Sequence, residues 1–134
     1  MAKAGSRNPA EQLPRWFHPL VEHSESYRFT ALILFDRARA QLAETAKKPS
    51  PDSAAAEHAA LSSMHLTVKA LLAARGFQVH GVRPALELVR ILYEDAALRS
   101  LTAKYSEVLS LKVRGAEAVS TARALFATAE KTLA

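Results

Sequence analysis

The feature that most limits the possible folds is a long apolar-periodic run between the start signal Ser50-Pro51-Asp52 and the stop signal Gly76. Ser50 is a good N-cap, Pro51 suits the first helical position, and Asp52 adds negative charge to the first turn. Glycine suits the left-handed position that follows a helix. The run therefore predicts a helix over residues 51–75. Its expected buried positions are Leu61, Met64, Val68, Leu71 and Leu72.

Apolar spacing elsewhere predicts four further helices. They are expected over residues 21–46, over a short stretch beginning near Pro84, and over residues 96–112 and 117–133. The first of them has its apolar positions at Phe29, Leu32, Ile33, Phe35 and Leu42. Trp16, Phe17 and Leu20 are expected to anchor the start of the chain on the core. Short connections favour antiparallel neighbours.

The composition agrees with a helical domain. The chain has 134 residues, of which 49% are hydrophobic but only 7% aromatic, and alanine is abundant, which favours helices over a sheet. We therefore expect an all-α fold, an antiparallel up-and-down bundle of four to five helices. The expected division is a flexible N-terminal lead-in over residues 1–14 and one bundle over residues 15–134.

Charge and hydropathy indicate where the protein is expected in the cell, but they identify no partner. The 18 Lys and Arg outnumber the 13 Asp and Glu, giving a net charge of +5, but Lys47-Lys48 is the only adjacent basic pair. The charge therefore fits either a solvated mixed surface or an anion-binding face formed by the fold. No apolar run is long enough for a membrane span, and the N-terminus lacks the apolar core of a secretory signal. We expect a cytoplasmic protein that does not enter a membrane.

The residues argue against metal and nucleophile chemistry. His58 and His65 are seven positions apart, whereas a helical zinc site places its histidines four apart. The chain has no cysteine and no GxSxG elbow, and its 4 glycines are isolated rather than grouped in a phosphate loop. We therefore expect no metal, no cofactor and no catalytic nucleophile.

Four residues are candidates for contact with an anion or a nucleotide. His65 and Lys69 are one helical turn apart and project from the same side of their helix, beside the apolar stripe. His80 stands in a loop, where it either contacts a ligand or bonds to the next helix terminus. Arg114 lies near the end of the fourth expected helix, where it either binds phosphate or favours the helix dipole.

Three segments resemble the HEPN domain family, which consists of four- to five-helix bundles. VKALLAARG at residues 68–76 is similar to the family's second-helix signature. His80, followed by PALEL at residues 84–88, stands where the family has its loop and third helix. LKVRGAEAVSTARALFATAEKTL at residues 111–133 is similar to the last helices. The resemblance covers roughly residues 25–133 and implies a dimeric bundle.

The chain departs from the family at the ribonuclease motif. Catalytic members carry an arginine, four to six further residues and a histidine, which act together across a dimer interface. If Arg114 is that arginine, the histidine should stand at Val119, Ser120 or Thr121, and none of these is histidine. Neither His65 nor His80 stands at that spacing from Arg114. A general base is then missing, and we expect no catalysis.

The leading hypothesis is a non-catalytic, homodimeric binding or regulatory module of the HEPN type that binds nucleotide or RNA weakly. The resemblance also implies a nucleotidyltransferase partner, in a pair of toxin–antitoxin type. Two alternatives stay open: a divergent ribonuclease of the toxin type that uses Arg114, Lys69 and His65, and a structural helical assembly protein.

Overall fold

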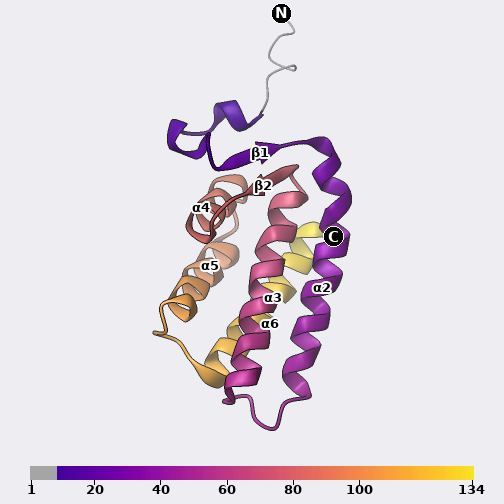
Figure 1. Ribbon diagram of the computed structural model, residues 1–134, viewed down its shortest axis with the longest axis vertical. Coiled ribbons are helices and arrows are strands. Elements are labelled where there is room, and N and C mark those ends of the chain that lie inside the picture. The colour runs from indigo at the N-terminus through magenta and orange to yellow at the C-terminus, as the bar shows by residue number, and fades with distance from the viewer. Residues whose placement is uncertain (1–8) are drawn as a thin grey trace, which may run out of the picture.

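The computed structural model describes residues 9–134, and within them the chain forms five α-helices (Figure 1). These are α2 (Arg28–Ala46), α3 (Ala54–Ala73), α4 (Val82–Leu92), α5 (Ala96–Leu109) and α6 (Gly115–Leu133). Three short 3₁₀ helices, η1 (Pro9–Gln12), η2 (Arg15–Phe17) and η3 (Glu25–Tyr27), and two strands, β1 (Val21–His23) and β2 (Phe77–Val79), complete the fold. The predicted all-α class is confirmed.

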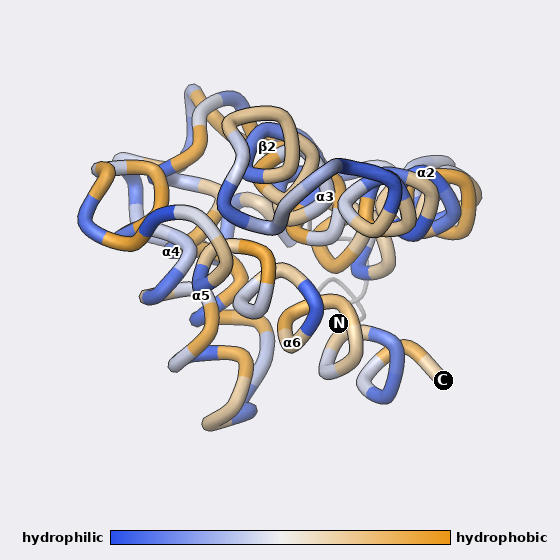
Figure 2. The backbone as a smooth tube through the Cα atoms, turned by 90° about the horizontal axis from the view of Figure 1, so that it is seen from below, coloured by the Kyte–Doolittle hydropathy of each residue, from blue (hydrophilic) through white to orange (hydrophobic). Residues whose placement is uncertain are grey.

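The helices pack around α3. It contacts α2, α4, α5 and α6. Figure 2 shows α2 and α3 side by side, with α6 packed beneath them. Consecutive long helices are antiparallel, as the short connections predict, for α2 with α3 and for α5 with α6 (Figure 1). The neighbours α3 and α6 run in the same direction, because α4 and α5 together carry the chain back to the other end of the bundle.

The stripe predicted for α3 is confirmed, but the helix starts later than expected. Met64, Val68, Leu71 and Leu72 are at most 3% exposed, and Leu61 is half-buried. Ser53, not Ser50, is the N-cap, because its hydroxyl oxygen accepts the backbone N–H of Ala56 at 3.1 Å. Ser50 instead accepts the N–H of Asp52 in a preceding turn.

The C-terminal end of α3 agrees with the glycine signal. The helix ends at Ala73 rather than at Arg75, and Gly76 has a φ of +82°, as predicted. A Cβ at Gly76 would lie 2.7 Å from Nε2 of His23. Glycine is therefore favoured by the backbone conformation and also leaves room for the imidazole of His23.

The prediction of a helix from residue 21 is wrong, because residues 21–23 form β1. This strand pairs antiparallel with β2, with Val21 opposite Val79 and His23 opposite Phe77. The two strands close the end of the bundle above α3 (Figure 1). Their partners lie more than 50 positions apart in the sequence, so the pairing depends on the tertiary fold rather than on local periodicity.

The apolar face predicted for α2 is partly wrong. Phe29, Leu32 and Ile33 are 82%, 76% and 56% exposed. Small residues face α3 instead: Ala38 is fully buried, and the hydroxyl of Ser63 donates to its carbonyl oxygen at 2.9 Å. The two backbones approach closely enough for this bond, so the contact excludes bulky side chains. The large ones turn outward, and hydrophobic colour marks the outer edge of α2 in Figure 2.

Two positions expected in the core of α2 do face inward. Phe35 is 7% exposed and stacks on Phe126 of α6, with ring centroids 4.5 Å apart. Leu42 is half-buried. These contacts attach α2 to α6.

The expected N-terminal anchor is formed by one aromatic residue rather than two. Phe17 is 1% exposed, whereas Trp16 is 53% exposed and stacks on the Phe17 ring with centroids 3.9 Å apart. Leu20 is half-buried. Of the expected lead-in, residues 1–8 lie outside the described residues, and Pro9–Gln12 form η1. No helix of the described chain is long and apolar enough to cross a membrane.

Candidate functional site

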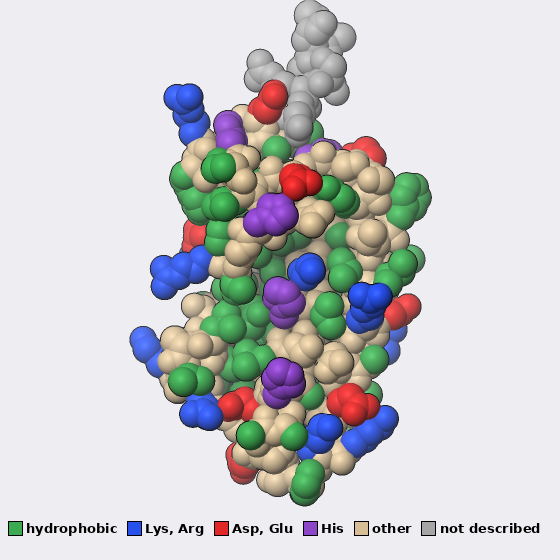
Figure 3. Space-filling model, viewed as in Figure 1, with side chains coloured by type: hydrophobic (Ala, Val, Ile, Leu, Met, Phe, Trp, Pro, Cys, Tyr) green, Lys and Arg blue, Asp and Glu red, His purple; other side chains and the backbone are tan. Residues whose placement is uncertain are grey.

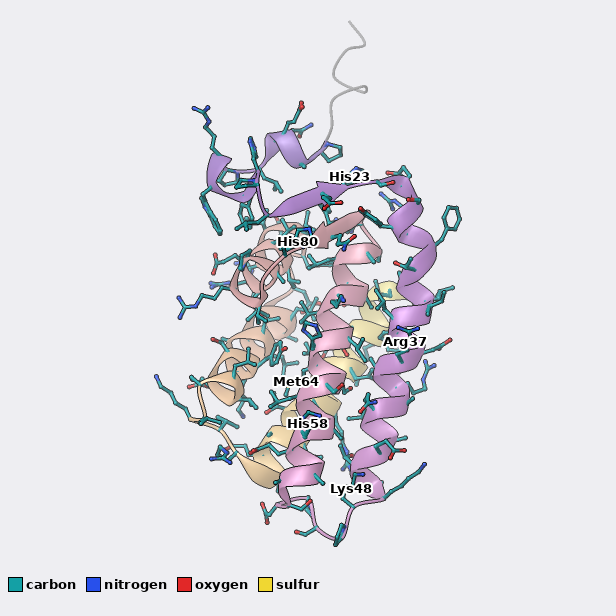
Figure 4. All side chains as sticks on the ribbon, in the orientation of Figure 1. His23, Arg37, Lys48, His58, Met64 and His80 are labelled. Atoms are coloured by element: carbon teal, nitrogen blue, oxygen red, sulfur yellow. The ribbon has the colours of Figure 1, made fainter. Side chains whose placement is uncertain are left out.

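A groove of about 730 Å³ crosses the outer face of α3. Its walls come from α2 on one side and from β2, the loop after it and α4 on the other. The groove brings together three of the four sequence candidates, His65, Lys69 and His80, and adds Arg37 from α2. Figure 3 shows histidine, lysine and arginine side chains among hydrophobic ones on this face, and Figure 4 places His80 near β2 and Arg37 on α2.

The groove has an apolar floor and a cationic rim. Val68, Leu72 and Phe77 belong to the core and are at most 5% exposed. Lys69 and Arg37 are exposed above them, and among residues 9–134 neither has a carboxylate oxygen within 4 Å. Their charges are therefore left for solvent or for an anion from outside the chain.

His65 is a titratable residue of α3 that lines the groove one helical turn before Lys69. Partial burial against the groove, and then the charge of Lys69, lower the pKa of His65 below its ordinary value of 6.5. The residue is exposed and lines the groove. Both causes favour the neutral form of His65 while the groove is empty, and an incoming anion would favour its protonation.

His80 belongs to a chain of hydrogen bonds at the end of the groove. Its Nε2 lies 2.9 Å from Oε2 of Glu22, and the Tyr27 hydroxyl donates to Oε1 of the same carboxylate at 2.8 Å. These bonds, His80 first, lower the pKa of Glu22. Because an ionised carboxylate only accepts, Nε2 carries a proton, and Nδ1 is the nitrogen free to react. The sequence allowed a bond from His80 to the next helix terminus. The structure shows that the side chain bonds to Glu22 of β1 instead.

Arg114 does not belong to this groove. The expectation that it ends the fourth helix is wrong, because α5 ends at Leu109 and Arg114 stands at the start of α6. Its Nε donates to Oε2 of Glu57 at 2.9 Å and to Oε1 at 3.2 Å. The guanidinium and the backbone N–H of Gly115 lower the pKa of Glu57. Arg114 is thus neither a C-terminal cation nor part of the groove.

Two carboxylates, one from the turn before α3 and one from its first turn, cap the start of α6. Glu57 accepts the N–H of Gly115 at 2.8 Å, and Asp52 accepts the N–H of Ala116 at 2.9 Å. The first N–H groups of a helix and its positive dipole end attract anions. Here the protein supplies both anions itself, so the charge of Arg114 is already neutralised. Sequence reasoning missed this pairing because it requires α3 and α6 to be parallel.

Sequence reasoning also missed that Arg75 and His80 have the arginine-to-histidine spacing of the ribonuclease motif. Arg75 and His80 are separated by four residues, Gly76 to Val79, which is within the range given for the ribonuclease motif. The expectation of no general base considered only Arg114. The two side chains stand at opposite ends of β2: Arg75 lies over the ring of Tyr93, 4.4 Å from its centroid, and His80 bonds to Glu22. They do not converge within one chain.

The described residues contain no group of three His, Cys, Asp or Glu side chains able to hold a metal ion. No protein family, curated protein or solved structure matches this chain. The resemblance to HEPN domains therefore stays a prediction, and the candidate site has to be interpreted from its own chemistry.

Proposed function

We propose that this protein is a binding module whose groove takes a phosphate-bearing nucleotide. The observation that carries the proposal is the pair Arg37 and Lys69, which lie above an apolar floor without protein counter-ions in the described part of the chain. The phosphate of a nucleotide would neutralise the cationic rim of Arg37 and Lys69. Its nucleobase would pack on the apolar floor. A volume of about 730 Å³ is within the usual range for small-molecule sites.

The electrostatic surroundings support a ligand with negative charge. The carboxylate of Glu22, which contacts the groove through His80, is held by hydrogen bonds with Tyr27 and His80. A bound phosphate would also accept hydrogen bonds from Lys69 and Arg37, and bonds to charged groups are stronger than those between neutral groups. Uncharged ligands of the same shape should bind more weakly.

Amide NMR spectra recorded with AMP, adenosine or inorganic phosphate test the proposal. We expect AMP to shift signals of residues 65–82 and of the Arg37 region, and each of the other two compounds to cause smaller shifts at equal concentration. Shifts confined to residues 114–117, or no saturable shift with AMP, would contradict a nucleotide site in the groove.

A second candidate function is RNA cleavage, and the spacing of Arg75 and His80 favours it. His80 has a carboxylate that fixes its tautomer, leaving Nδ1 to take a proton from a ribose 2′-OH. Arg75 stays protonated and could neutralise phosphate only. Because the two side chains lie at opposite ends of β2, a shared site would need residues of two copies.

The test for cleavage is incubation of single-stranded RNA with the protein in EDTA. Cleavage lost in both His80→Ala and Arg75→Ala, but kept in His58→Ala, would favour this second function over simple binding. His58 is a suitable control because it is an exposed histidine farther down α3 (Figure 4). Intact RNA in all samples would leave the binding module as the only proposed function.

The homodimer predicted from the sequence stays a prediction, as does the nucleotidyltransferase partner. The exposed residues Phe29 and Leu32 of α2 are the natural place to test the dimer. We expect Leu32→Asp to convert a dimer to a monomer in sedimentation, whereas Leu111→Asp, on an exposed leucine outside α2, should not. A monomeric wild-type protein at micromolar concentration would refute the dimer.

A further inference from the structure

A second groove, of about 600 Å³, lies on the other side of α4 from the candidate site. Trp16 of η2, the helix α4 and the helix α5 form its walls. None of its lining residues belongs to the first groove. At the start of α4, Val82 lines the first groove and Arg83 lines the second.

Trp16 offers a flat aromatic face that is held in place from behind. Its indole stacks on the ring of Phe17, with planes inclined by 24°, and Phe17 is almost fully buried. The backbone N–H of Phe17 donates to the Pro14 carbonyl at 3.0 Å, and Nε2 of His18 bonds to the Leu13 carbonyl at 3.0 Å. The segment is therefore fixed by local bonds, and about half of the indole surface remains open.

Cations of α4 lie beside this face. Arg83, Glu87 and Arg90 are spaced so that they share one face of the helix, and all three line the groove. Glu87 pairs with Arg90 at 3.6 Å, whereas Arg83 has no carboxylate within 4 Å among residues 9–134. The exposed Ser106 of α5 adds a hydroxyl group on the opposite wall.

We propose that this second groove binds single-stranded nucleic acid, with one base stacked on Trp16 and a neighbouring phosphate on Arg83. An aromatic face beside guanidinium groups is the usual composition of such sites, because every base has a π-face and every link carries a negative charge. The net charge of +5 favours the approach of a polyanion. The inference is independent of the nucleotide proposed for the first groove.

The lone tryptophan of the chain makes a direct test possible, since Trp16 is the only Trp and lies outside the first groove. We expect hexaadenylate RNA or DNA to quench its fluorescence saturably and with lower affinity at higher salt. Equal quenching by both would support recognition of base and phosphate, and a preference for RNA would add a contact to the 2′-OH. No saturable quenching by either would overturn the proposal.

Two variants separate this site from unspecific charge attraction. Arg83→Ala should weaken binding several-fold, whereas Arg123→Ala, an exposed arginine of α6, should not. Trp16→Ala, followed with a fluorescein-labelled oligonucleotide, should weaken binding about five- to 150-fold, the effect of losing one base stack. Equal loss in Arg83→Ala and Arg123→Ala, or quenching by hexaglutamate but not by hexaadenylate, would overturn it. Lys69→Ala should leave the quenching unchanged, so the two grooves are tested separately.

Discussion

The cations near the two ends of α3 differ in whether a carboxylate of the described chain pairs with them. At its start, Arg114 meets Glu57, and the carboxylates of Glu57 and Asp52 also fill the N-terminal positions of α6. Farther along, Lys69 faces a groove with Arg37, and in the described chain no carboxylate pairs with either. A basic residue is therefore a candidate ligand contact only where the fold leaves its charge without a partner.

The same distinction separates stability from binding. Arg114 ties two helices together, so its surroundings should matter for folding. Lys69 projects from one helix into solvent. Its removal should therefore lower the affinity for a ligand and leave the free energy of unfolding nearly unchanged.

The sharpest contrast within the groove is between its floor and its rim. Leu72 is 2% exposed, so Leu72→Ala should lower the free energy of unfolding by about 2–5 kcal/mol. Lys69→Ala should change it by less than about 0.5 kcal/mol, as is usual for an exposed side chain. Urea denaturation of both variants measures this. Equal effects of the two substitutions would mean that the rim is structural.

At the capped end, Glu57→Ala should lower the free energy of unfolding by about 1–3 kcal/mol. The substitution leaves the N–H of Gly115 without its acceptor and Arg114 without its counter-ion. Glu107→Ala on the exposed side of α5 is the matched control and should cost less than about 0.5 kcal/mol. If Glu57→Ala and Glu107→Ala unfolded at the same temperature, a structural role for the pair Glu57 and Arg114 would be contradicted.

The stabilisation by Glu57 should depend on pH in a defined direction. Because Arg114 and the N–H of Gly115 lower its pKa from 4.5, the carboxylate contributes stability that is fully present above pH 4.5. That contribution is lost as the pH falls through the lowered value. The difference in stability between wild type and Glu57→Gln should therefore be constant near neutral pH and shrink in acid. A difference that grows on acidification would reverse the assignment.

The smallest effect concerns His65. In the free protein its NMR titration midpoint should lie below 6.5, and Lys69→Met should raise it by removing the secondary cause of the shift. Saturation with AMP should raise the midpoint further, because a nearby phosphate favours the imidazolium. A midpoint that does not respond to AMP would show that the phosphate binds elsewhere.

The sequence predicted α3 better than α2 for a physical reason. The stripe of α3 lies at the centre of the bundle, where every apolar residue on one face meets a neighbour. In α2 the close contact through Ala38 and Ser63 selects small residues, so Phe29 and Leu32 turn outward against the usual trend. Periodicity shows which residues share a face, but not how closely another helix approaches it.

The site was predicted in part for a related reason. His65 and Lys69 are one turn apart on a single helix, so local geometry was enough to group them. Arg37 and His80 join them only through the packing of α2 and the pairing of β1 with β2. Arg114 was misplaced for the same reason: its partner Glu57 is 57 positions away, so only the tertiary fold brings them together.

We propose that Arg37 and Lys69, which lack carboxylate partners among residues 9–134, and not Arg114, bind the phosphate of a nucleotide. Calorimetric titration of AMP into wild type, Arg37→Ala, Lys69→Ala and Arg114→Ala measures the contribution of each cation. We expect each of the first two substitutions to raise Kd by about tenfold, the loss of one charge-assisted hydrogen bond, and Arg114→Ala to change Kd less than about twofold. Loss of binding in Arg114→Ala with unchanged binding in Lys69→Ala, or no binding of AMP by the wild type, would contradict this proposal.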